Sequence, residues 1–158
     1  EFGGGYGCMA RIFSKINQKV SYICFDTNYV NLLQYYYLKQ NNLDVGFSKK
    51  NNYFLMSNFS KNKKFLLKKI HNHFFIANWS LSETPIKFRN KFLKIIKNSQ
   101  FILIAFQEYF EELDNLSYFQ NLKKKLDKKF HIKIIKNKYY KGNIFKRQNH
   151  YFLIGKKL

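Results

Sequence analysis

The chain opens on the stretch Glu1-Phe2-Gly3-Gly4-Gly5-Tyr6-Gly7, and the rest of the sequence is arranged around it. We interpret it as the last residues of a buried strand, followed by a glycine-rich turn and a helix that begins near Cys8. Spaced glycines permit positive φ angles in a tight turn and let the next helix pack closely on its strand. They also let a ligand approach the backbone, beside a helix N-terminus whose unpaired N–H groups attract negative charge.

An acidic residue follows this turn at the spacing of a nucleotide-binding unit. Asp26 lies 19 residues after Gly7, at the end of the apolar run 20–25. In a βαβ unit of this kind, a carboxylate at the tip of the second strand holds ribose hydroxyls. The alternative interpretation is a flexible glycine-rich terminus followed by an unrelated strand.

Length and composition predict a single folded domain over residues 1–158, with 46% hydrophobic and 20% aromatic residues. The first residue is not Met and the chain begins at a strand end, so we expect the upstream part of that strand to be missing. No apolar run of about 18 residues predicts a transmembrane helix, and no signal-peptide pattern is present. Cys8 and Cys24 lack the spacing of a metal site, which favours free thiols in a reducing, cytoplasmic compartment and no bound metal.

The chain is strongly basic, with 29 Lys and Arg against 9 Asp and Glu and a formal net charge of +20. Such a charge favours polyanions such as RNA or anionic membrane surfaces. However, the lysines are spread through most segments, and Lys, Asn, Ile, Phe and Tyr are all abundant, as an AT-rich coding sequence would give. We therefore favour composition over nucleic-acid binding as the origin of the charge.

Apolar periodicity predicts strands that alternate with helices. The expected helices are 8–16, a helix capped by Thr27 and ended by Asn41-Asn42, 60–70, 86–98 and 111–129. The expected later strands are 20–25, 53–57, 74–78, 101–106, 131–135 and 151–155, with ambiguous or polar connections at 43–51 and 137–149. No helix separates the last two strands, so they should pair antiparallel. This order predicts an α/β fold with a doubly wound, mainly parallel sheet and a final antiparallel strand.

This order of elements resembles that of the Rossmann-like S-adenosylmethionine-dependent methyltransferases. Two stretches sharpen the resemblance to one bacterial family, the sugar O-methyltransferases: Glu1–Arg11, and Asn78-Trp79-Ser80-Leu81-Ser82-Glu83-Thr84-Pro85. Gln107, Asp114-Asn115 and His150-Tyr151 fit the same pattern. The resemblance spans the chain and corresponds to the catalytic domain of that family, truncated at its N-terminus.

The resemblance implies a site for S-adenosylmethionine. Its expected residues are Glu1, Gly3, Gly5, Gly7, Asp26, Thr27, Ser57, Asn58, Asn78 and Trp79. Glu1 would contact the amino end of the cofactor, and Asp26 would take the ribose hydroxyls. Ser57-Asn58 stands where many such enzymes carry an acidic residue near the adenine, and an amide or hydroxyl can also bond an adenine edge. Trp79 would line the floor of the site or serve as a packing aromatic.

A sugar hydroxyl is a poor nucleophile while it keeps its proton, so we expect a general base. Sites in open α/β sheets lie beyond the carboxyl ends of the parallel strands. His150, Glu83 and Glu108 should lie at that edge, whereas His131 begins a strand and should lie at the opposite one. His150 ranks first because its ordinary pKa of about 6.5 suits proton abstraction near neutral pH. The alternatives are a polar residue at the start of the final strand for His150, a helix cap for Glu83 and a solvated carboxylate for Glu108.

The expected function is therefore O-methylation of a sugar hydroxyl in bacterial glycan or polysaccharide biosynthesis, with a small molecule or glycan as acceptor. An RNA methyltransferase is the first alternative, which the charge permits. No Asn-Pro-Pro-Tyr type motif for a base nitrogen follows the fourth strand, and this weighs against it. A fragment with only a structural role is the second alternative.

Overall fold

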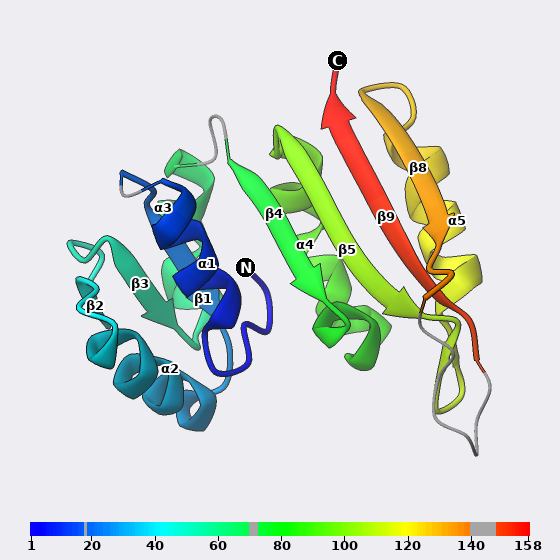
Figure 1. The fold of residues 1–158 in the computed structure, drawn as a ribbon. Helices are drawn as coiled ribbons and strands as arrows, with labels where there is room; N and C mark the ends of the chain where they lie inside the picture. Colours follow the sequence, from blue (N-terminus) through cyan, green and yellow to red (C-terminus); the bar gives the residue numbers. More distant parts are fainter. Residues whose placement is uncertain (18, 70–72, 140–147) are drawn as a thin grey trace. The chain divides into compact units, whose positions relative to one another are not determined.

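The computed structural model describes residues 1–17, 19–69, 73–139 and 148–158 (Figure 1). The chain divides into two compact units, Glu1–Leu66 and Leu67–Leu158, and each has its own sheet. Two parts of the sequence predictions lie outside the described residues: Ile70 at the end of the helix expected over 60–70, and residues 140–147 of the expected polar connection. Within the described ranges, no helix is both long enough and apolar enough to cross a membrane.

The first unit is a small parallel α/β layer. Its elements are α1 (Cys8–Ile16), β1 (Tyr22–Phe25), α2 (Asn28–Gln40), β2 (Val45–Gly46), β3 (Tyr53–Met56) and the start of α3 (Phe59–Lys69). The strands lie in the order β1-β3-β2, and both pairs are parallel. The predicted helices over 8–16 and after Thr27 are confirmed, and the ambiguous connector 43–51 contains the short strand β2.

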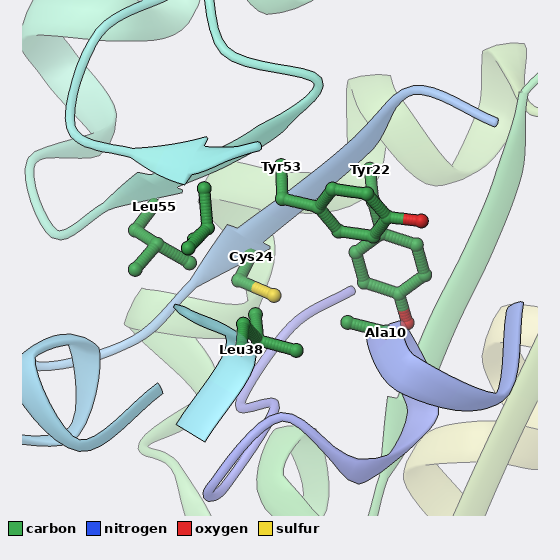
Figure 2. Packing of buried hydrophobic residues seen from close by; sticks show 7 residues of the cluster. Ala10, Tyr22, Cys24, Leu38, Tyr53 and Leu55 are labelled. Carbon is green, nitrogen blue, oxygen red and sulfur yellow. The ribbon is translucent and has the colours of Figure 1, made fainter. Parts of the chain in front are cut away.

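The core of this unit gathers side chains from α1, α2 and all three strands (Figure 2). Its members are Ala10, Tyr22, Cys24, Leu38, Val45, Tyr53 and Leu55. The rings of Tyr22 and Tyr53 stack on neighbouring strands with centroids 6.0 Å apart. Such aromatic pairs add to the stabilisation that the burial of their apolar area provides.

The second unit contains a sheet, a short ribbon and two long helices. Its elements are β4 (Phe74–Asn78), the 3₁₀ helix η1 (Ser80–Glu83), α4 (Ile86–Asn98), β5 (Phe101–Gln107), β6 (Tyr109–Phe110), β7 (Leu113–Asp114), α5 (Asn115–Leu126), β8 (Phe130–Lys136) and β9 (His150–Lys157). The predicted helix over 86–98 is confirmed as α4, and Pro85 directly precedes it, where a missing N–H would have no helical partner.

The final antiparallel pair is confirmed, but the sheet is more mixed than predicted. The strand order is β4-β5-β9-β8, and the last strand, β9, lies between β5 and β8 (Figure 1). β4 and β5 are parallel, whereas β9 is antiparallel to both of its neighbours. The mainly parallel arrangement therefore holds for β1, β2 and β3, while antiparallel pairs predominate in the second sheet. The order of the strands in the sequence does not reveal that β9 lies between β5 and β8, because β9 could pair with either edge of β8.

The prediction of a helix over 111–129 is wrong at its start, and the observed helix ends three residues before the predicted end. Residues 109–114 form the antiparallel ribbon β6–β7, and α5 covers Asn115–Leu126. Glu111 turns the ribbon with a φ of 52°. The carboxylate of Asp114 accepts hydrogen bonds from the Ser117 backbone N–H at 2.9 Å and from its hydroxyl at 2.7 Å. This N-cap fixes the start of the helix.

Candidate functional site

The residues predicted from sequence fall into two groups, one in each unit. In the first unit, Gly3, Gly5 and Gly7 have φ angles of 68°, 54° and 98°. Only glycine adopts such angles without strain. At Gly5, no described atom lies within 4 Å of an added Cβ, whereas at Gly7 a Cβ would meet Leu38 Cγ at 3.2 Å. The turn is therefore open at Gly5 and closely packed at Gly7.

The segment that enters the turn is paired with β1. The Glu1 nitrogen donates to the Ile23 carbonyl at 2.7 Å, and the Phe25 N–H donates to the Glu1 carbonyl at 2.9 Å. The Gly3 N–H then donates to the Phe25 carbonyl at 2.8 Å. This parallel ladder confirms the predicted strand end, and it places the glycine turn at the carboxyl end of β1.

Asp26 follows β1 directly and its carboxylate meets the glycine turn. Oδ1 accepts from the Thr27 N–H at 2.8 Å and Oδ2 accepts from Gln34 Nε2 at 3.3 Å. The backbone N–H groups of Gly5 and Gly4 lie near enough to this carboxylate to favour its charged form. Burial raises the pKa of Asp26 above its ordinary value, and these surrounding N–H groups oppose that rise. The structure thus brings together the two features that the sequence placed 19 residues apart.

The carboxylate of Glu1 lies beneath the same turn. Its Oε2 accepts a hydrogen bond from the Tyr22 hydroxyl at 2.9 Å, and a Cβ built on Gly4 would lie 2.9 Å from it. Burial raises the pKa of Glu1, while the hydrogen bond from Tyr22 lowers it. A second, half-buried carboxylate therefore faces the turn at Gly4.

The three remaining residues of this group follow β1 and β3 at the same edge of the parallel sheet. Thr27 caps α2, and its hydroxyl accepts from the Val30 N–H at 3.4 Å. Asn58 accepts from the Lys61 N–H at 2.9 Å, so it serves α3 in the same way. Ser57 directly follows β3 and is half-buried. Both Thr27 and Asn58 thus have an evident structural role beside the predicted one.

In the second unit, the predicted residues also gather at one sheet edge. Asn78 ends β4, and His150 begins β9 directly opposite Gln107 at the end of β5. His131 pairs with Lys156 at the other end of the sheet. The predicted placement of His150 at the carboxyl edge, and of His131 at the opposite edge, is therefore confirmed.

Trp79 links β4 to β9 at this edge. Its indole Nε1–H donates a hydrogen bond to His150 Nδ1 at 2.9 Å, and the two rings meet edge to face. An indole nitrogen is a donor only, so the neutral His150 ring accepts at Nδ1 and carries its proton on Nε2. Burial lowers the pKa of His150 below its ordinary value, which keeps the ring neutral near pH 7.

Glu83 and Glu108 differ in their surroundings. Glu83 is exposed at the end of η1, and its Oε1 accepts from Gln107 Nε2 at 3.4 Å. Glu108 is half-buried, and its Oε2 accepts from the side-chain amide and the backbone N–H of Asn149 at 2.8 and 3.3 Å. The Glu108 backbone bonds Asn149 and Asn115 as well. Glu108 therefore joins β5 to the segment before β9, and its carboxylate is the more constrained of the two.

Sequence reasoning missed a buried arginine behind this edge. Arg89 is 1% exposed, and its guanidinium donates to the Thr84 carbonyl at 2.7 Å, the Ser82 carbonyl at 2.7 Å and Asn115 Oδ1 at 2.8 Å. It also lies 4.9 Å from the ring centroid of Tyr118. Among the described residues, no carboxylate forms an ion pair with it. Arg89 fixes the η1 loop to α5, and in a helix rich in lysine no sequence signal sets it apart.

No protein-family model matches the chain, and no curated protein sequence is similar to it. Solved structures do share its fold. The methyltransferase domain of the bacterial protein CtHen1-CN superposes with a TM-score of 0.62 and 12% identity, over 97% of this chain and 87% of that one. A chain of the Pnkp1/Rnl/Hen1 RNA repair complex gives 0.58 and 13% identity, over 97% of this chain and 36% of that one. The chain therefore has an α/β fold similar to that of a methyltransferase domain.

Proposed function

We propose that this chain is an S-adenosylmethionine-dependent methyltransferase that methylates a hydroxyl oxygen, with a sugar as the acceptor. The observation that carries the proposal is the proximity of the open glycine turn to the Asp26 carboxylate at the end of β1, where one amide group, Gln34 Nε2, bonds both. In βαβ nucleotide sites these two features bind adjacent parts of one ligand. The likeness in fold to a methyltransferase domain supports this class of cofactor.

The residues of the first unit fit such a cofactor chemically. Gly5 leaves its side of the turn open, so a ligand can approach the backbone there. Asp26 offers carboxylate oxygens to the ribose hydroxyls, which would replace some of the donors that it now binds. Glu1 supplies a second negative charge near the turn for the ammonium group of the methionine part. Thr27, Ser57 and Asn58 complete the proposed set in this unit, and for Asn78 and Trp79 the resemblance alone proposes a cofactor role.

S-adenosylmethionine supplies the methyl group, and the protein mainly aligns donor and acceptor. We assign the acceptor side to His150, Glu83 and Glu108, in that order. In the described arrangement the His150 lone pair at Nδ1 is engaged by Trp79. The ring can therefore take a proton at Nδ1 only when the indole releases it. Glu83 is the alternative base, because its carboxylate is exposed and is held only by the long contact from Gln107.

A sugar is favoured by the resemblance of the stretch Asn78–Pro85, and by the polar groups near His150. Gln107, Glu83 and Ser82 form a connected set, in which the Ser82 hydroxyl lies 2.7 Å from Gln107 Oε1. Amides and carboxylates suit a ligand with several hydroxyls, because each hydroxyl both donates and accepts. The two cysteines are unpaired thiols, and we place the reaction in the reducing cytoplasm on that ground.

RNA is the second candidate acceptor, and two observations favour it. The chain carries a net charge of +20, and one of the similar structures belongs to an RNA repair complex. Binding to a phosphate backbone would weaken steeply with added salt, whereas binding of a neutral sugar would not. Salt dependence therefore separates the two acceptors.

The test is methyl transfer from isotope-labelled S-adenosylmethionine to a panel of nucleotide sugars, glycans and RNA oligonucleotides at low and moderate salt. We expect label in a sugar fraction, with little dependence on salt. Label in RNA that disappears as salt is raised would replace the sugar assignment by the RNA one. Absence of label from every acceptor, together with absence of cofactor binding, would contradict the methyltransferase assignment itself.

A further inference from the structure

Gln34 forms a hydrogen-bonded link between the glycine turn and Asp26, two parts of the proposed cofactor site. It lies on α2 and is 0% exposed. Its Nε2 is 2.8 Å from the Gly5 carbonyl and 3.3 Å from Asp26 Oδ2. A side-chain amide has two N–H donors, so one serves the glycine turn and the other serves the carboxylate.

We propose that Gln34 is a positioning residue for S-adenosylmethionine, because its amide fixes the glycine turn and the Asp26 carboxylate at one separation. This inference rests on the proposed function. Gln34 acts through Asp26 and Gly5 and does not itself reach the reacting atoms. Its role is to hold both groups in place before the cofactor arrives, which reduces the ordering that binding requires.

The surroundings of the side-chain carbonyl oxygen, Gln34 Oε1, indicate that stability alone does not explain a glutamine at this position. Gln34 Oε1 is buried and has no hydrogen-bond partner among the described residues. An unpaired buried carbonyl costs stability. An apolar side chain at position 34 would avoid that cost beside the buried Leu38. The two donated hydrogen bonds are what an apolar residue could not provide.

Gly4 gives independent support for the same contact. Its φ is not in the left-handed region, so backbone conformation does not demand glycine there. A Cβ on Gly4 would instead meet Gln34 Nε2 at 3.1 Å and Glu1 Oε2 at 2.9 Å. Position 4 is therefore restricted by the side chains that close on the turn, and Gln34 is one of them.

The link also predicts a pH signature. The hydrogen bond from Gln34 stabilises the charged form of Asp26, and so lowers the pKa of this carboxyl against the effect of burial. Among the described residues, the other titratable groups that interact with Asp26 are the Glu1 carboxyl and the Cys24 thiol. With the amide removed, the pKa of Asp26 should rise further, and the acid limb of cofactor binding should move to higher pH.

The experiment compares Gln34→Met with wild type in the full chain, since methionine has a similar length but no donor. The control is Gln40→Met, the same change at an exposed position of the same helix. Calorimetric titration with S-adenosylmethionine over a pH series should give about tenfold weaker binding in Gln34→Met, the worth of two modest hydrogen bonds. In Gln34→Met the pH at which half of the affinity is lost on the acid side should be higher than in wild type. Gln40→Met should match wild type in both affinity and midpoint. NMR titration of the Asp26 carboxyl without cofactor should show the same upward shift.

Each outcome bears on one proposal. Equal affinity and equal acid midpoints in Gln34→Met and wild type would overturn the role of Gln34 and leave the cofactor assignment intact. Failure of wild type to bind would overturn the cofactor assignment, and this role with it. If Gln34→Met does not fold, the nearly isosteric Gln34→Glu replaces it. It should bind more weakly still near neutral pH, because a carboxylate there faces two acceptors, and unchanged affinity in that variant would overturn the role.

Discussion

The indole Nε1–H of Trp79 donates a hydrogen bond to Nδ1 of His150 across 71 positions of sequence, at 2.9 Å. The Trp79 backbone adopts φ 60° and ψ −38°, an uncommon conformation for a bulky residue. Its own N–H is held by the Ala105 carbonyl at 2.8 Å, so the strand next to it stabilises this turn. Backbone strain of this kind costs about 1–3 kcal/mol and often lies at functional sites. The contact orients His150 at the sheet edge that we assign to the acceptor.

The first prediction concerns the protonation of His150. Trp79→Phe keeps an aromatic ring but removes the donor that stabilises the neutral imidazole, so the pKa of His150 should rise. NMR of the imidazole nitrogens should find the Nε2–H tautomer in wild type at neutral pH. An unchanged pKa in Trp79→Phe would show that the indole does not control this ring.

The second prediction concerns stability and pH. In the unfolded chain His150 should titrate near its ordinary pKa of about 6.5, and in the folded chain its pKa is lower. Below about pH 6.5 the unfolded state therefore binds more protons, and the free energy of unfolding should fall as pH falls toward the folded pKa. His150→Gln should flatten this part of the curve in urea denaturation. A curve of unchanged slope would contradict the assigned shift.

The third prediction separates the candidate bases. If His150 is the base, His150→Ala should lower turnover by about 10²–10⁴-fold, and cofactor affinity should barely change. Glu83→Gln should then have a small effect, because its neutral amide keeps a similar shape. Near-normal turnover in His150→Ala, with a large loss in Glu83→Gln, would move the role to the carboxylate.

Local signals in the sequence predicted much of the fold. The apolar runs indicated β4 and β5, Thr27 marked the start of α2, and the helix expected over 86–98 is α4. The spacing between Gly7 and Asp26 predicted a glycine turn beside a carboxylate, and the structure has this arrangement. These features depend on residues close in sequence, or on a unit whose geometry is nearly constant.

The features that the sequence did not reveal depend on tertiary pairing. The position of β9 between β5 and β8 follows from which strand edges remain open, and no residue of β9 specifies it alone. The two-residue strand β2 is too short to show periodicity. Gln34 and Arg89 are polar side chains on helices, and their burial becomes evident only when their partners are in place.

The fourth prediction concerns Arg89. Arg89→Met should lower the free energy of unfolding by about 2–4 kcal/mol, because it leaves buried oxygens of Ser82, Thr84 and Asn115 without their donor. Lys94→Met, at an exposed position of the same helix, should change stability by less than about 0.5 kcal/mol. Urea denaturation measures both variants. Equal stability of Arg89→Met and wild type would show that the guanidinium does not hold the η1 loop.

The central claim is that the opening turn and Asp26 bind S-adenosylmethionine, and calorimetric titration with the cofactor and its demethylated product tests it most directly. We expect saturable binding by wild type, a loss of about 1–3 kcal/mol in Asp26→Ala, and near-complete loss in Gly5→Arg, whose position has a φ of 54°. Asp127→Ala, which removes an exposed carboxylate from the other unit, should bind like wild type. No binding by wild type, or equal affinity in Asp26→Ala, Gly5→Arg and wild type, would contradict the claim.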